Sequence, residues 1–172
     1  MLVRLSLGRE FWEWNWVMKE SKWLIIEHYK ETIRTVKGLS TIKEIAWKTP
    51  VSSGKWTVAE VIGHLVYWDE FVVAKRLPYV MSDEPFPPAP HVEVFNEEAV
   101  QMSRSQTQEE VIQRFIQTRE ELIEAIQHFP PYVWDREYSF RATSLLLATY
   151  FMGLLKHDEH HFNQIKDVLY SS

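Results

Sequence analysis

Residues 57–65 read TVAEVIGHL, which is the pattern of a helix that begins at a capped N-terminus. Thr57 and Glu60 have the spacing of a capping box, in which the hydroxyl and the carboxylate each bond to a free backbone N–H group. Apolar side chains then recur one helical turn apart up to about Leu77, where Pro78 follows. His64 lies on this apolar face, where a lone histidine is more often a hydrogen-bonded core residue than a ligand.

Three further segments have the same helical spacing of apolar residues. They cover residues 18–36, 107–129 and 143–170. The second of them also opens with a capping box, made by Thr107 and Glu110. No segment has the alternation that is typical of a strand in a sheet. We therefore expect an all-α fold, a four-helix bundle.

The connection between the second and third helices is rich in proline. Residues 82–90 hold four prolines, so this part of the chain is expected to be irregular and partly extended. With its neighbours to Ser103 it could span about 60 Å if extended, which is longer than the second helix. The order up-down-down-up, with a Pro-rich crossover between helices 2 and 3, is therefore permitted. The simpler order up-down-up-down fits the sequence as well.

The N-terminal segment has several interpretations. Residues 11–16 read FWEWNW and alternate aromatic and polar side chains, which is the period of a strand. The same residues could continue the first helix, form an arm that packs on a partner subunit, or precede a true start at Met18. The chain is thus divided into residues 1–17, a Trp-rich arm or an extension of helix 1, and residues 18–172, the four-helix bundle.

The composition excludes several classes of protein. The chain has 172 residues, a net charge of -5 and scattered Lys and Arg residues, so nucleic acid is not expected as its main partner. It has no cysteine, which excludes disulfides and thiolate ligands and fits a reducing cytoplasm. No apolar run approaches the length of about 18 residues that a membrane span needs. We expect a cytoplasmic protein of one globular domain that acts on a small molecule.

The segment KHDEHH, residues 156–161, carries the residue types of a metal site. His157 has helical neighbours three and four residues on, His160 and His161. At about 100° per residue, His161 falls on the apolar side of the helix with His157 at its edge, whereas His160 falls near the polar side. The inward pair is therefore His157 with His161, and Asp158 falls within the same inward arc.

A third ligand must come from another helix, because an open catalytic site usually has three protein ligands. His64 is the histidine of the second helix. If that helix is antiparallel to the last one, His64 comes near the level of His157 and His161, whereas parallel helices leave a gap of about 10–15 Å. Spacing alone leaves two interpretations open: a three-histidine metal site, or ordinary surface and core histidines. The others are expected on the surface or in loops: His28, His91 and His128.

Residues 56–65, WTVAEVIGHL, and residues 157–165, HDEHHFNQI, together resemble the DinB/YfiT-like superfamily of bacterial proteins. The first segment is similar to the start of that family's second helix. The second resembles its His-x-x-x-His segment, which runs on into Gln and an aliphatic residue. The resemblance covers about residues 22–169 and implies an up-down-down-up bundle, commonly a homodimer. It also implies a zinc or nickel ion on three residues: His64, His157 and His161.

The resemblance also implies a choice of chemistry, because relatives include bacillithiol-type S-transferases, a mycothiol-dependent isomerase and metal-dependent hydrolases. The leading hypothesis is that the metal activates a low-molecular-weight thiol, which attacks a small electrophile against aromatic walls such as Trp68, Phe71 or Tyr150. Hydrolysis by a metal-bound water, with Asp158 or Glu60 as the base, is the second. A metal-stabilised binding module without turnover is the third. Asp158 is more often an orienting partner than a base, and the capping box already explains Glu60.

Overall fold

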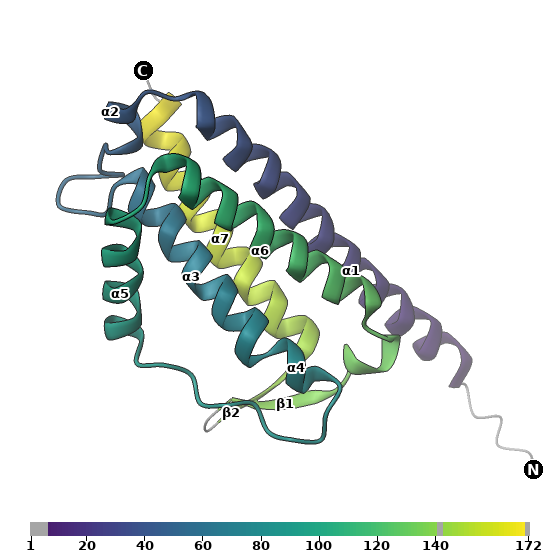
Figure 1. Cartoon of the computed structure of the whole chain (residues 1–172). Helices are drawn as coiled ribbons and strands as arrows, with labels where there is room; N and C mark the ends of the chain where they lie inside the picture. Colours follow the sequence, from purple (N-terminus) through teal and green to yellow (C-terminus); the bar gives the residue numbers. More distant parts are fainter. Residues whose placement is uncertain (1–6, 141–142, 171–172) are drawn as a thin grey trace, which may run out of the picture.

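The computed structural model describes residues 7–140 and 143–170, and side-chain surroundings from residue 21 onward. Four long helices lie side by side there (Figure 1). They are α1 (Leu7–Gly38), α3 (Val58–Lys75), α6 (Gln108–His128) and α7 (Leu147–Tyr170). The centre of the assembly is α6, which packs on α1 and α3, while α7 packs mainly on α1. The prediction of a mainly helical, bundle-like fold is therefore confirmed.

Both predicted capping boxes are present. The backbone N–H of Glu60 donates to the Thr57 hydroxyl at 3.2 Å, and the Thr57 N–H donates to the Glu60 carboxylate at 2.7 Å. Thr107 and Glu110 make the same reciprocal pair at the start of α6. Each pair satisfies two backbone donors that a helix start leaves free, so the sequence sets where α3 and α6 begin.

The structure describes three further helices that the sequence analysis did not predict. They are α2 (Glu44–Trp47), α4 (Leu77–Val80) and the longer α5 (Val92–Arg104). The sequence indicates an extended connection for residues 92–103, and the structure places them in α5 instead. In the structure, α5 packs on α3 so closely that a Cβ atom added to Gly63 would lie 2.4 Å from the Cβ of Ser103. Glycine is therefore required where the two helices touch.

The expectation of a fold without strands was wrong at one place. Strand β1 (Glu137–Phe140) pairs antiparallel with β2 (Thr143–Leu146), so α7 begins at Leu147 rather than at residue 143. Tyr138 of β1 has a buried side chain, and its hydroxyl donates a hydrogen bond to the carbonyl oxygen of Val80. That bond anchors the hairpin on α4. Strands of four residues are too short to show a clear alternation in the sequence, so the hairpin could not be predicted from it.

The N-terminal helix begins before the position that the apolar spacing indicated. Because α1 starts at Leu7, residues 7–17 are helical and the strand period of the aromatic segment is not used. Residues 1–6 lie outside the described part of the chain, and the division at residue 17 stays a prediction. None of the described helices combines the length and the apolar character that crossing a membrane requires.

Candidate metal centre

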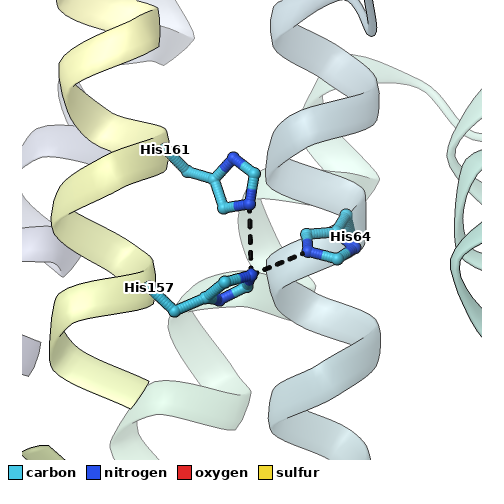
Figure 2. Close-up of side chains that lie close together, drawn as sticks. All are labelled: His64, His157 and His161. Atoms are coloured by element: carbon cyan, nitrogen blue, oxygen red, sulfur yellow. Dashed lines mark hydrogen bonds between the residues drawn. The ribbon is translucent and has the colours of Figure 1, made fainter. Parts of the chain in front are cut away.

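Three imidazole rings converge between α3 and α7. His157 and His161 lie one turn apart on α7, and His64 faces them from α3 (Figure 2). The Nε2 atom of His157 is 3.2 Å from Nε2 of His64 and 3.2 Å from Nε2 of His161. His64 and His161 are buried, with 3% and 8% of their surfaces exposed. The structure thus brings together the three residues that the sequence singled out.

The three rings are held in the neutral form that a metal ligand needs. Burial, together with the neighbouring rings of His161 and His157, lowers the pKa of His64 to about 3. Burial and the ring of His157 lower the pKa of His161 to about 4, and burial lowers that of His157 as well. At neutral pH one nitrogen of each ring therefore keeps a lone pair, and that nitrogen is the atom that can bind a metal ion.

Neighbouring side chains fix the orientation of the imidazoles. The Nδ1 atom of His161 lies 3.0 Å from the Oε1 atom of Gln164. If Nδ1 donates its proton to that oxygen, the lone pair is left on Nε2, which faces the other two histidines. The indole of Trp56 lies against His64 at a ring-centroid distance of 4.8 Å and stacks on His161 at 6.4 Å.

The spacing of the nitrogen atoms fits a metal ion. A tetrahedral metal with nitrogen ligands at about 2.0–2.1 Å places those nitrogens about 3.3 Å from one another. Two of the Nε2–Nε2 distances are 3.2 Å, and the ligand atoms of the set all lie within 4.8 Å of one another. The two short Nε2–Nε2 contacts also have hydrogen-bonding distances, with the donor set by the tautomer of each ring. The same spacing fits three nitrogen ligands of one metal ion.

A buried ionic network lies directly behind the cluster. Asp158 accepts two hydrogen bonds from the guanidinium of Arg119, and its Oδ2 atom lies 3.0 Å from Nε2 of His28. The Nε atom of Arg119 donates to Asp69 at 2.6 Å. Burial raises the pKa of Asp158, but Arg119 and His28 outweigh it and hold that pKa below its usual value. Asp158 is therefore ionised, and it sits beside His157 in sequence.

Neither acidic residue named as a possible base is free to act as one. Both oxygens of Asp158 are engaged by Arg119 and His28, which is the role of an orienting partner. The Glu60 carboxylate holds the cap of α3 through one oxygen and accepts from Arg104 at 2.6 Å through the other. Neither side chain belongs to the group of metal-binding type around His64.

The other histidines lie largely where they were expected. His160 is exposed, as helical phase predicted, and His91 and His128 are exposed as well. The expectation for His28 was wrong, because its side chain is only 16% exposed and contacts Asp158. Its distance of 130 positions from Asp158 in the sequence explains why no local pattern could show this.

The cluster opens on one side and meets aromatic side chains on the other. A pocket of about 430 Å³ lies beside His161. Its other lining residues come from α3, α7 and the loop before α3: Val51, Gly54, Lys55, Trp56, Val61 and Gln164. Toward the opposite end of α3, the ring of Trp68 lies 6.4 Å from that of His64, and Phe71 and Phe95 continue the wall. The aromatic walls expected from Trp68 and Phe71 are thus beside the cluster.

Comparisons with known proteins agree with this architecture. A sequence model of the DinB superfamily matches residues 13–165. Among solved structures, YfiT from Bacillus subtilis, described as "a probable metal-dependent hydrolase with an unusual four-helix bundle topology", is similar over 98% of this chain and 91% of its own, at 16% identity and a TM-score of 0.74. A mycothiol-dependent maleylpyruvate isomerase is similar over 88% of this chain but only 60% of its own, at 12% identity and a TM-score of 0.65. No curated protein matches the chain.

Proposed function

The chain belongs to the DinB superfamily, and from this premise we propose that it is a metal-dependent enzyme that transfers a low-molecular-weight thiol to a small electrophile. The metal is a divalent ion, zinc or nickel, on His64, His157 and His161. One observation carries the proposal: three neutral imidazoles converge on one point, while the nearby carboxylates are already engaged. Three imidazoles suit zinc and nickel alike.

We assign each residue of the site a role from its position. A divalent metal at this point supplies a positive charge that lowers the pKa of a thiol, as metals do for coordinating thiols. Gln164 fixes the ring of His161, and Trp56 covers two of the imidazoles. The thiol proton would leave to solvent through the pocket beside His161. The sulfur would donate an electron pair to the electrophilic carbon as the bond from that carbon to its leaving group breaks, and the leaving group would depart with that bond's electrons. Trp68 and Phe71 would supply the wall against which the electrophile rests.

Hydrolysis is the second candidate, favoured by the description of the YfiT structure. Activation of water by a metal usually needs a nearby base to take up the proton. Asp158 and Glu60 are the acidic residues that the sequence offered, and both are held in ion pairs. This occupancy is why we place thiol transfer first. A binding module without turnover is the remaining alternative.

The proposal extends to the assembly. We propose the order up-down-down-up for α1, α3, α6 and α7, with the Pro-rich segment between α4 and α5 as part of the crossover. Figure 1 supports this order, because α3 and α6 both begin near the end of the bundle that holds α2. We further propose a cytoplasmic homodimer that acts on a small molecule and has no nucleic acid partner.

Metal analysis of the purified protein tests the first part of the proposal. We expect one divalent ion for each chain, and loss of most of it in His64→Ala. His160→Ala is the matched control, because that ring lies on the same helix turn as His161 but is exposed. Absence of stoichiometric metal under metal-replete conditions, or full retention in His64→Ala, would contradict the assigned ligands.

An electrophile assay tests the chemistry. Metal-loaded protein should consume monobromobimane only when a low-molecular-weight thiol is present, and His64→Ala should not. Bacillithiol, mycothiol and glutathione are to be compared, because the thiol differs between hosts. Turnover of esters or amides without any thiol would favour hydrolysis. No turnover in either assay, with metal removal lowering only the melting temperature, would favour a binding module.

A further inference from the structure

Arg76, at the C-terminal end of α3, is a buried cation without a carboxylate partner. Only 3% of its surface is exposed. Its Nη1 atom donates to the carbonyl oxygens of Lys75 and Pro87, both at 2.8 Å. Its Nε atom is buried and has no hydrogen-bond partner among the residues that the structure describes. Charged side chains are rarely buried to this degree unless they are paired, because the uncompensated charge loses its hydration.

The surroundings of Arg76 form a cavity that is short of hydrogen-bond donors. Its volume is about 360 Å³, and among its lining residues are Arg76, Phe86 and Phe140 together with four prolines: Pro85, Pro87, Pro88 and Pro90. Proline has no N–H group, so these four contribute no donors to a ligand. No acidic side chain lines the cavity within the described residues. Ser139 contributes a hydroxyl to the lining, and the guanidinium is the charged donor there for an anionic group.

The aromatic rings around Arg76 suit an apolar body attached to that anionic group. The guanidinium carbon lies 4.6 Å from the ring centre of Phe71, 5.3 Å from that of Phe86 and 5.8 Å from that of Phe140. Cation–π contacts offset part of the desolvation cost but leave the net charge in place. Tyr150 stacks on Phe140 at 4.8 Å.

The Tyr150 hydroxyl adds a second donor beside the arginine. Burial raises the pKa of Tyr150 to about 12, although the charge of Arg76 and a hydrogen bond with its side chain act against this rise. The hydroxyl therefore keeps its proton at neutral pH and can donate it in a hydrogen bond.

We propose that Arg76 is the anion-binding residue of this cavity and that it takes the carboxylate of a small acid with an aromatic or other apolar body. The aromatic wall connects the cavity to the histidine cluster through Phe71 and Trp68. Phe71 lies seven residues beyond His64, or about 10 Å along the helix axis. Arg76 itself lies twelve residues beyond His64, or about 18 Å along the helix axis, so only an elongated acid held at Arg76 extends along this wall to the cluster. That this acid is the electrophilic substrate rests on the proposed function; binding of the acid does not.

Binding of benzoate to the metal-free protein, followed by calorimetry, tests the inference independently of the metal. Benzamide has the same ring without the charge and is the matched ligand. Arg76→Met should weaken benzoate binding by at least about tenfold, since a hydrogen bond to a charged group is worth about 1.5–3 kcal/mol. Arg76→Lys keeps the charge without the planar fork, so its affinity for benzoate should lie between that of the wild type and that of Arg76→Met. Arg34→Met, at an exposed arginine paired with Glu31, is the control and should bind as the wild type does.

Several results would overturn the inference. They are benzamide binding as tightly as benzoate, unchanged affinity in Arg76→Met, inorganic phosphate binding in place of benzoate, and no binding of any of these ligands. If Arg76→Met does not fold, Arg76→Lys and the shift of the Arg76 Nε–H signal by benzoate in the wild-type NMR spectrum decide the matter. A protein that binds benzoate but holds no metal would reject the proposed function and leave this site standing, whereas the reverse would reject this site alone.

Discussion

Replacing Gly63 with alanine tests the contact between α3 and α5, on which the position of His64 depends. The added Cβ atom would lie 2.4 Å from the Cβ of Ser103, which is well inside the contact distance of two carbon atoms. Overpacking of this kind costs about 1–3 kcal/mol. The better helix propensity of alanine returns about 1 kcal/mol. We therefore expect the free energy of unfolding to fall by up to about 2 kcal/mol, because the clashing atom is fixed to the backbone of α5.

Gly153→Ala is the matched control, because it makes the same change inside a long helix without a clash. A Cβ atom at that position would meet nothing within 4 Å. The gain in propensity then stands alone, and the free energy of unfolding should rise by up to about 1 kcal/mol. Adding Ser103→Gly to Gly63→Ala removes the opposing Cβ atom. The double variant should be more stable than the two single effects predict, which a double-mutant cycle measures.

Urea unfolding followed by far-UV circular dichroism gives these free energies, and it should be done on metal-free protein so that metal binding adds nothing. For a chain of this size, each kcal/mol moves the melting temperature by about 2–4 °C. The reasoning is refuted if Gly63→Ala is as stable as Gly153→Ala, or if Ser103→Gly does not relieve it. Because residue 63 precedes His64, weaker metal binding by Gly63→Ala is a second readout.

Three shorter predictions concern the site. Gln164→Leu should weaken metal binding by about 10–100-fold, because it releases the ring of His161; unchanged affinity in a chelator competition would contradict the role given to Gln164. Asp158→Asn should lower the free energy of unfolding by about 3–5 kcal/mol, because it leaves the buried charge of Arg119 short of its partner; a loss below about 1 kcal/mol in urea unfolding would show that the pair is dispensable. Metal affinity should be nearly constant from pH 8 down to about pH 6.5, because the lowered pKa values keep protons from competing for the ring nitrogens. It should fall as the pH drops through the lowered pKa of His157 and then through those of His161, about 4, and His64, about 3. A tenfold loss for each pH unit already between pH 7 and 6 would contradict those pKa values.

Local patterns in the sequence revealed most of what positions the site. The caps at Thr57 and Thr107, together with the apolar spacing, predicted the starts of α3 and α6, because a cap and a helical face are made by residues close in sequence. Helical phase separated His161 from His160 for the same reason. The family resemblance, carried by residues 56–65 and 157–165, is confirmed by the match to the DinB superfamily.

What the sequence missed depends on contacts between distant residues. Arg119 reads as one polar residue on the third long helix, but it joins Asp69 and Asp158 from two other helices. The hairpin of β1 and β2 is too short to show a period, and its anchor on Val80 is far away in the chain. Gln164 had a signal, since it follows His161 by one turn, but only the structure shows that its amide reaches the ring.

The position of the three histidines has a mechanical consequence. His64 and His157 are 93 positions apart in the chain, and α3 packs mainly on α5 and α6 whereas α7 packs mainly on α1. A metal ion between them would join α3 to α7, two helices that contact each other little, and would close a long loop, which is where a cross-link restricts the unfolded chain most. Chelation would then loosen α7 from α3 before the rest of the fold, and amide protons in the facing parts of these two helices would exchange sooner.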